Sequence, residues 1–428
     1  MFRTVGKRTT IRSESGMASP TGTPTSASPA NRTVQLRVDV PLLIVISILL
    51  VFGLLMVYSA SYDASLRVNE DPLQVFRRQG LFLLVGVVVA GVLSFFDYHF
   101  LKKLVVPAMI VTILALIAVL IIGEARQGAV RTLLGSSVQP SEMAKLVTVI
   151  YLAVWLHSKS DILNNVSFGL IPMAIMLGVI GGLIFVQPDY SAVMTIFLLG
   201  GLMFFLAGGD LKQIAIMVVV ALLMGFVVVQ ITRTGSERVG SYLAGLQDPT
   251  QASYHVRRSL EAFVNGGWLG VGIGKGETKL TGLPVPHTDS IFAVVGEELG
   301  MLGAVLLISL YILLLWRGLT IARRAPDELG ALLAAGLTLW LVFEAFINMA
   351  VMVNLLPFAG NALPFISSGG SNLMMSLIAI GILLNISRKA VQNKEESGRL
   401  FGAVVNLRGR DRRRRVSRPR RSESVDES

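Results

Sequence analysis

Ten long apolar blocks dominate this sequence of 428 residues. A helix of about 20 apolar residues crosses the hydrocarbon core of a bilayer, where only helices and closed barrels satisfy their backbone hydrogen bonds. Blocks of this length are typical of helices and not of the alternating strands of a barrel. Charged residues make up only 15% of the chain, whereas a soluble domain carries roughly a quarter. We therefore predict an all-α polytopic membrane protein with ten transmembrane helices, near 40–60, 76–96, 103–122, 142–157, 168–186, 190–207, 211–231, 290–316, 329–353 and 369–387.

The basic residues predict the orientation, because Lys and Arg collect in cytoplasmic loops. With an even number of spans both tails lie on one side, and the tails and loops of that side hold about 26 of the 38 basic residues. We expect a disordered cytoplasmic N-terminal tail over 1–38, a membrane domain over 39–390 and a basic, disordered cytoplasmic C-terminal tail over 391–428. A large extracytoplasmic loop, about 232–289, then separates the seventh and eighth helices.

The charge of the chain predicts a lipid partner. The formal net charge is +11, and the C-terminal tail contains the arginine run 412–415. A basic tail beside a membrane is attracted to anionic headgroups. We therefore expect the tail to contact anionic membrane lipids and not nucleic acid. A solvated or protein-binding tail is the alternative.

Polar residues at membrane depth are costly and therefore mark candidate functional positions. Residues 139–142 (Gln-Pro-Ser-Glu) open the fourth block, and the spacing of Lys145 places it on the helix face of Glu142. Residues 187–189 (Gln-Pro-Asp) separate the fifth and sixth blocks. Each cluster has a structural alternative: an internal ion pair for Glu142 and Lys145, and a helix N-cap for Asp189.

The long loop contains a glycine-rich stretch over 266–276. Glycines permit a backbone to approach a ligand closely, and Lys275, Lys279 and Arg257 suit the phosphates of a lipid-linked substrate. A nucleotide-binding P-loop needs Ser or Thr after its lysine and a strand before it, and Lys275 is followed by glycine. We therefore expect no nucleotide. A flexible surface turn is the alternative.

Three carboxylates, Asp289, Glu297 and Glu298, lie near the start of the eighth block. Stabilisation by the helix dipole explains one of them and not all three. A partly desolvated aspartate with a raised pKa would serve as a general base, and we assign that role to Asp289. Before the last block, 361–371 combines Pro, Ser and paired Gly, which predicts an irregular segment that lines a cavity or allows close helix packing.

At these positions the sequence resembles the SEDS family (shape, elongation, division and sporulation), which includes the FtsW and RodA proteins. The resemblance covers about residues 40–390 and leans toward the FtsW, cell-division type, through Val-Tyr-Ser-Ala-Ser at 57–61 and the long tails, while the elongation type stays open. The matching stretches are 57–61, 139–142, 187–189, 266–279, 287–300 and 363–367.

The resemblance implies a peptidoglycan glycosyltransferase that polymerises lipid II into β-1,4 glycan strands at the outer face of the bacterial cytoplasmic membrane. It also implies a class B penicillin-binding protein, a transpeptidase, as partner, together with other division or elongation proteins. The aspartate of the family's His-Thr-Asp motif, regarded as catalytic, falls on Asp289.

The chemistry fits that position. A sugar hydroxyl would lose its proton to Asp289 as it attacks an anomeric carbon and a lipid diphosphate departs, with inversion and no covalent intermediate. Cationic side chains, or alternatively a divalent cation, would stabilise the departing charge. The chain has no cysteine and its four histidines are dispersed, so we expect no metal site and no certain cofactor. We expect these further residues to contact substrate: Glu142, Lys145, Gln187, Asp189, Arg257, Lys275, Lys279, His287, Glu298 and Ser367.

Departures from the family pattern affect substrate contacts and not Asp289. Thr132 replaces a common Trp, Ser368 a usual Tyr, Ala359 a usual Thr, and His255 a frequent Gln. Two other functions stay open: a lipid II flippase, since polar residues inside a bundle also serve transport, and a noncatalytic division scaffold. The polar clusters favour the enzyme because they lie toward the outer face and not at the midplane.

Overall fold

The computed structural model describes residues 38–69, 71–122, 124–126, 129–132, 139–163 and 165–413. Within these ranges the side chains of 63–69, 124–126, 129–132 and 394–413 are not described. The predicted N-terminal tail lies, except for residue 38, outside the described residues. Helix α12 (Gly370–Arg413) continues past residue 390, and 414–428 are outside the described residues, so the character of the C-terminal tail stays a prediction.

Each of the ten apolar blocks forms a helix. The first seven are α1 (Val40–Asn69), α2 (Gln74–Phe95), α3 (Leu101–Ile122), α4 (Pro140–Ser158), α5 (Ile171–Val186), α6 (Tyr190–Leu206) and α7 (Leu211–Ile231). The last three are α10 (Ile291–Arg324), α11 (Glu328–Met352) and α12. Short helices η1 (Tyr98–Phe100), η2 (Ser160–Ile162) and η3 (Val166–Leu170) precede or follow these, and β1 (Glu124–Arg126) pairs antiparallel with β2 (Ala129–Thr132).

The structure confirms a helical, multi-pass membrane protein. Among the described residues eight helices are long and apolar enough to cross a membrane. The other two are α4, which carries Glu142 and Lys145 near its start, and the shorter α6. These are the two blocks that are short in the sequence, and the count of ten spans stays a prediction.

Helix α11 forms the centre of the bundle and packs against α10, α4, α6 and α12. Most of its apolar stretch is buried inside the protein, whereas no residue in the apolar stretch of α7 is buried, and α7 contacts α6 and α8. An exposed apolar helix is stable only in lipid, so α7 is a peripheral, lipid-facing helix.

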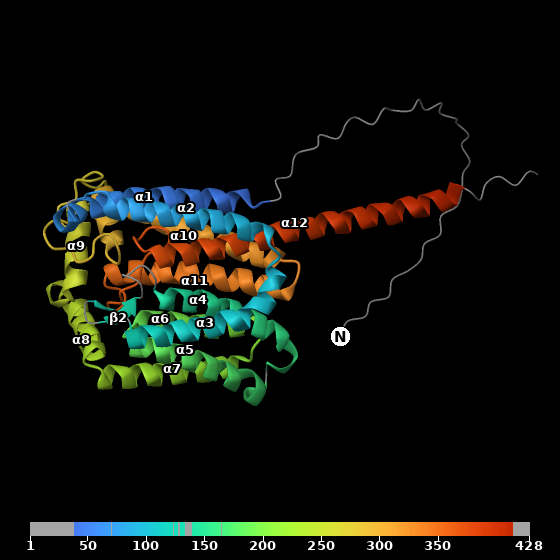
Figure 1. Cartoon of the computed structure of the whole chain (residues 1–428), viewed down its shortest axis with the longest axis horizontal. Helices are drawn as coiled ribbons and strands as arrows, with labels where there is room; N and C mark the ends of the chain where they lie inside the picture. Colours follow the sequence, from blue (N-terminus) through green and yellow to red (C-terminus); the bar gives the residue numbers. More distant parts are fainter. Residues whose placement is uncertain are drawn as a thin grey trace, which may run out of the picture. The chain divides into compact units, whose positions relative to one another are not determined.

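The segment predicted as a long loop folds into two further helices. They are α8 (Arg233–Gln247) and α9 (Tyr254–Gly266), joined through η4 (Pro249–Gln251). Figure 1 shows α8 and α9 running across one end of the bundle, nearly perpendicular to the other helices. Helix α9 packs against α10 and α11, and its buried residues are Val256, Ser259, Ala262 and Gly266.

The glycine-rich stretch docks on a kink in α10, and its predicted approach to a ligand stays a prediction. Gly300 breaks α10 with φ +68°. A Cβ atom at Gly270 would lie 2.2 Å from the carbonyl oxygen of Glu298. The amides of Val271 and Gly272 donate to the carbonyls of Glu297 and Glu298 at 3.0 and 2.9 Å. The close approach that glycine permits is thus to the protein's own backbone.

The irregular segment before α12 is buried against α1. Leu363, Phe365 and Ile366 are almost fully buried, and Phe365 has φ +69°. A Cβ atom at Gly53 in α1 would lie 2.1 Å from the carbonyl oxygen of Phe365. The absence of a side chain at Gly53 therefore allows α1 to support this segment.

Replacing Gly53 by Ala should destabilise the protein by about 1–3 kcal/mol, because the methyl group would overpack a backbone contact. Thermal unfolding of the detergent-solubilised protein measures the effect. The matched control is Gly91→Ala in α2, where a Cβ meets nothing within 4 Å and better helix propensity should leave stability equal or higher. Equal midpoints for the two variants would contradict the proposed contact.

Candidate active site

A cavity of about 640 Å³ lies at the end of the bundle that α8 and α9 cover. Its walls come from the first turns of α4 and α6, the second half of α11, the helices α8 and α9, and the segments before α10 and α12. Polar and charged side chains dominate the lining: Gln139, Glu142, Lys145, Asp189, Ser191, Arg238, His255, Asp289, Glu344 and Asn361. An apolar bundle thus encloses a cavity suited to a polar ligand.

Asp289 lines this cavity from a turn whose backbone carbonyls accept hydrogen bonds from α11 and from the segment before α12. The carbonyl of Asp289 accepts a 2.8 Å hydrogen bond from the amide nitrogen of Asn348 in α11. Ser367 donates to the carbonyl of Thr288 at 2.7 Å, and the amide of Ser368 donates to the carbonyl of His287 at 2.8 Å. These three hydrogen bonds fix the backbone that carries the carboxylate.

The side chain of Asp289 faces the segment before α12. A Cβ atom at Gly360 would lie 2.9 Å from Asp289 Oδ2, so a larger residue there would press on the carboxylate. The structure thus places a half-buried carboxylate on the cavity wall next to a glycine, which leaves room for a substrate hydroxyl.

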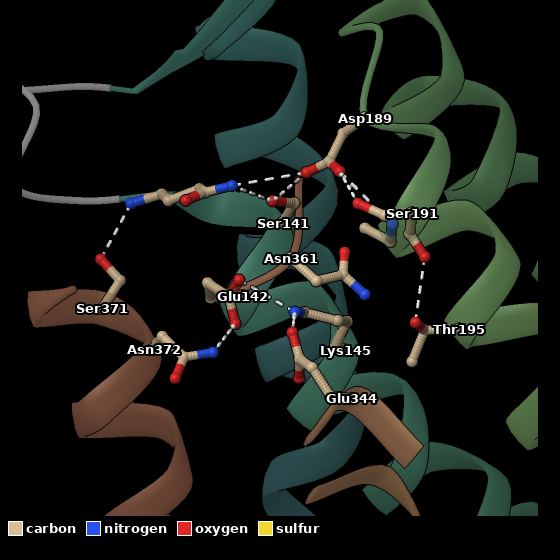
Figure 2. Close-up of polar contacts among 12 residues, drawn as sticks. Ser141, Glu142, Lys145, Asp189, Ser191, Thr195, Glu344, Asn361, Ser371 and Asn372 are labelled. Carbon is tan, nitrogen blue, oxygen red and sulfur yellow. Dashed lines mark hydrogen bonds and ion pairs between the residues drawn. The ribbon is translucent and has the colours of Figure 1, made fainter. Parts of the chain in front are cut away.

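Lys145 is buried between two carboxylates (Figure 2). Its Nζ lies 2.9 Å from Glu142 Oε1 and also pairs with Glu344 of α11. Asn372 of α12 donates to Glu142 Oε2 at 3.0 Å. The ion pair that the helical spacing predicts for Glu142 and Lys145 is confirmed, and the structure extends it to Glu344. The positive charge of Lys145 is thus engaged by two carboxylates of the protein itself.

Asp189 both caps a helix and lines the cavity, so the two interpretations of the sequence are compatible. Its Oδ1 accepts from the amide of Ala192 at 3.3 Å and from Ser191 at 2.9 Å, and its Oδ2 accepts from Ser141 at 2.9 Å (Figure 2). The carboxylate therefore joins the starts of α4 and α6.

Four of the sequence-predicted site residues converge on the cavity: Glu142, Lys145, Asp189 and Asp289. Ser367 and His287 take part in the hydrogen bonds that support the turn of Asp289: Ser367 donates to the carbonyl of Thr288, and the carbonyl of His287 accepts from Ser368. Gln187 is buried and donates to the carbonyl of Leu116 at 3.0 Å, which ties α5 to α3. The roles that we predict for these residues in substrate binding stay predictions.

The predicted cations of the long loop do not line the cavity. Lys279 is bound to Glu298 at 2.6 Å and to Ser59 of α1 at 3.0 Å. Arg257 is exposed and lies over the ring of Tyr254, and Lys275 is exposed. Glu298 therefore serves to fasten the loop to α1 in this structure.

Two charged residues that line the cavity were not singled out in the sequence: Glu344 and Arg238. Glu344 is a lone carboxylate inside the apolar block 329–353, which is itself a signal of a functional position. Arg238 lies in a segment rich in polar residues and has no comparable signal. Asn361 belongs to the segment 361–371, for which lining a cavity was one of the two predictions, and it does line the cavity.

The described residues contain no group of three His, Asp or Glu side chains arranged to hold a metal ion. What the cavity offers chemically is a positioned carboxylate, Asp289, together with hydrogen-bond donors such as Asn361, whose Nδ2 is buried and has no partner among the described side chains. A carboxylate that can accept a proton next to amide donors is suited to activating a hydroxyl group.

Comparison with known proteins gives consistent matches over the membrane domain. The model of a family described as "Cell cycle protein", which groups FtsW, RodA and SpoVE, matches residues 40–392. A protein of Geobacter sp. (strain M18) named "Probable peptidoglycan glycosyltransferase FtsW" is 38% identical over 356 residues, covering 82% of this chain and 97% of the relative. Stage V sporulation protein E of Bacillus subtilis is 34% identical, with 82% and 97% covered.

Solved structures give the same result for the fold. A chain from a study of the structural coordination of polymerization and crosslinking by a peptidoglycan synthase complex superposes with a TM-score of 0.69 at 26% identity, covering 83% of this chain and 99% of that one. The crystal structure of the rod shape determining protein RodA from Thermus thermophilus gives a TM-score of 0.61 at 25% identity, with the same coverage.

Replacing Lys145 by Met should cost about 3–5 kcal/mol of stability, because it leaves Glu142 and Glu344 buried without a counter-charge. Adding Glu344→Gln to this variant should recover part of the loss. Thermal unfolding measures both, with the exposed Lys212→Met as control. A midpoint for Lys145→Met equal to that of the control would show that the buried ion pair does not stabilise the fold.

Acidification should destabilise the turn that carries Asp289. Burial lowers the pKa of His287 below its ordinary value of 6.5, so the folded protein binds a proton at His287 less readily than the unfolded chain. Stability is therefore full above pH 6.5 and falls below it, by up to about 1.4 kcal/mol per pH unit for one proton. Unfolding midpoints measured across this range should fall less steeply for His287→Gln; parallel curves would contradict the assignment.

Proposed function

This chain belongs to the family of cell cycle proteins that includes FtsW, RodA and SpoVE, and from that membership we propose that it is a peptidoglycan glycosyltransferase of the FtsW type. It polymerises lipid II into β-1,4 glycan strands for the cell wall. The relatives' names supply the reaction class, and the cavity with Asp289 is the single observation in this chain that carries the proposal.

The reaction takes place at the outer face of the cytoplasmic membrane, with both termini in the cytoplasm. The cavity lies at one end of the bundle, beneath α8 and α9. The opposite end carries basic helix termini, including Lys102, Arg323, Arg324 and Lys389. Because basic residues favour the cytoplasmic side, the cavity faces outward, where the lipid-linked sugar of lipid II is available.

Asp289 acts as the general base. The attacking sugar hydroxyl gives its proton to the carboxylate while its oxygen bonds to the anomeric carbon of the donor and the bond from that carbon to the diphosphate breaks. A single base suffices for inversion, so no covalent enzyme intermediate is formed. Hydrogen bonds from Asn348, Ser367 and Ser368 to the backbone of residues 287–289 keep the carboxylate in position during the reaction.

Glu142, Lys145 and Asp189 shape the sugar-binding wall. Each lines the cavity and is already held by hydrogen bonds between helices, so the wall is preformed before substrate binds (Figure 2). A preformed polar wall orients a sugar through its hydroxyl groups at little entropic cost.

The protein works with a class B penicillin-binding protein, the transpeptidase that crosslinks the new strand. The similar chain from a peptidoglycan synthase complex supports this proposal. Its role is in cell division, which the division-type relatives support.

A lipid II flippase is the competing function. A transporter is expected to bind its substrate near the bilayer midplane, whereas most cavity residues come from the first turns of α4 and α6, from α8 and α9, and from the segments before α10 and α12. The position of the cavity therefore favours the polymerase.

Asp289→Asn should lower polymerisation by about 100-fold to 10,000-fold, the range that one general base contributes. Glycan strands made from lipid II by the purified protein, with and without the transpeptidase, provide the measurement. The amide preserves shape, and thermal unfolding checks that the fold is retained.

Asp248→Asn is the matched control, because this aspartate is exposed, caps η4 and does not line the cavity. Full polymerisation by Asp289→Asn would overturn the assignment of the base. Absence of polymer from the unsubstituted protein, combined with lipid II translocation that survives Asp289→Asn, would establish the flippase instead.

A further inference from the structure

A cation stacked between aromatic rings forms part of the cavity wall on the side of α8. The guanidinium carbon of Arg238 lies 5.6 Å from the ring centre of Phe358 and 5.7 Å from that of Tyr190. Aromatic faces attract a guanidinium and restrict its orientation. Arginine stays charged at any physiological pH, and its planar group matches phosphate oxygens in a paired, bidentate geometry.

This cation and the proposed base share one cavity and one supporting segment. Phe358 is two residues before Gly360, where a Cβ atom would lie 2.9 Å from Asp289 Oδ2. Arg238 and Asp289 both line the cavity. The segment 358–360 therefore lies against both the guanidinium of Arg238 and the carboxylate of Asp289.

The charges in the cavity show where an anion can bind. Among the described lining residues there are four carboxylates and two permanently cationic groups, Lys145 and Arg238. Lys145 is held between Glu142 and Glu344, so its charge is balanced by carboxylates of the protein itself. The wall formed by α8 carries Arg238 and is the part of the cavity that attracts an anion.

His255 adds a neutral donor at the same place. Its imidazole stacks on Phe358 with ring centres 4.3 Å apart and an interplanar angle of 29°. Its pKa is lowered first by burial and then by the charge of Arg238, so the ring is neutral at physiological pH. Its Nδ1 is buried and has no hydrogen-bond partner among the described residues. A buried polar atom without a partner, on a cavity wall, points to a ligand that completes it.

We infer that Arg238 and His255 bind the diphosphate of a polyprenyl-diphosphate-linked sugar, and that Arg238 stabilises the charge that this diphosphate gains when it leaves. The inference rests on the proposed function. As the bond from the anomeric carbon to the diphosphate oxygen breaks, its electron pair stays on that oxygen, beside the guanidinium. The proton of the attacking hydroxyl goes to Asp289. Phe358 is a positioning residue that orients both groups.

This assignment moves the diphosphate away from the glycine-rich loop. Lys279, the half-buried lysine of that loop, is engaged with Glu298 and Ser59, and neither it nor Lys275 lines the cavity. The loop fastens α10 to α1, while α8 and α9 supply the anion site. The function of α8 and α9, which lie across the cavity, is then to carry the diphosphate-binding residues.

The test measures binding separately from turnover. Undecaprenyl diphosphate is titrated into the full-length protein in detergent, and undecaprenol, which lacks the diphosphate, shows how much binding comes from the lipid chain alone. Arg238→Gln should weaken diphosphate binding about 10-fold to 100-fold, as expected for loss of a charge-assisted contact. Arg238→Lys keeps the charge and loses the planar group. Its affinity for the diphosphate should therefore lie between those of the unsubstituted protein and Arg238→Gln.

Two further variants show whether weakened diphosphate binding is specific to Arg238 and its aromatic support. Phe358→Leu keeps both polar groups, removes their aromatic support and should weaken diphosphate binding less than Arg238→Gln does. Arg233→Gln is the control, because Arg233 lies on the same helix, is almost fully exposed and pairs with Glu237. Undecaprenol binding should be the same in all variants, and thermal unfolding checks their folds.

Unchanged diphosphate binding in a folded Arg238→Gln variant would overturn the inference. An equal loss in Arg233→Gln would show an effect of net charge and would also overturn it. Failure of the proposed polymerase activity would appear as absent strand synthesis, whatever the diphosphate affinity, so the two failures are distinguishable.

Discussion

Two non-helical segments, 286–290 and 361–369, meet inside a bundle of apolar helices, and the site depends on how they satisfy each other's backbone. Irregular backbone at membrane depth is tolerated only where it is buried in protein or lines a cavity. Here Ser367 and Ser368 reach the carbonyls of Thr288 and His287, and Asn348 reaches that of Asp289. The same hydrogen bonds that make the irregular segments stable also fix the proposed base.

The helices were predictable from the sequence because hydropathy is a local property. Every apolar block became a helix, and the neighbouring pair Glu142 and Lys145 formed as its spacing predicts. Contacts between distant segments were not predictable. Glu344 reaches Lys145 from 199 positions away, and nothing local to Gly270 shows that its close contact would be the carbonyl of Glu298 rather than a ligand. Arg238 was missed because its significance lies in the aromatic rings that surround it in the fold.

The charged groups of the cavity divide into two sets with different consequences. The ion pairs of Lys145 are buried, and such pairs contribute little net stability because desolvation offsets attraction. They are better understood as fixing how α4, α11 and α12 meet, since breaking them leaves unpaired charge in the interior. Asp289 and Arg238 are half-buried and face the cavity. A bound anion would meet Arg238 there, and a substrate hydroxyl would meet Asp289.

Helix α12 links this arrangement to the opposite end of the bundle. Near its start, Asn372 donates to Glu142 and Ser371 accepts from the backbone amide of Gln139 at 2.9 Å. Further along, Lys389 lies 3.0 Å from Asp97. Burial alone would raise the pKa of Asp97, but hydrogen bonds from the backbone of His99 and from Lys389 lower it well below its usual range, so this contact stays ionic at physiological pH. One continuous helix is thus anchored by polar contacts at its start, beside the cavity, and again at Lys389, on the side of the bundle where α2 ends and α3 begins.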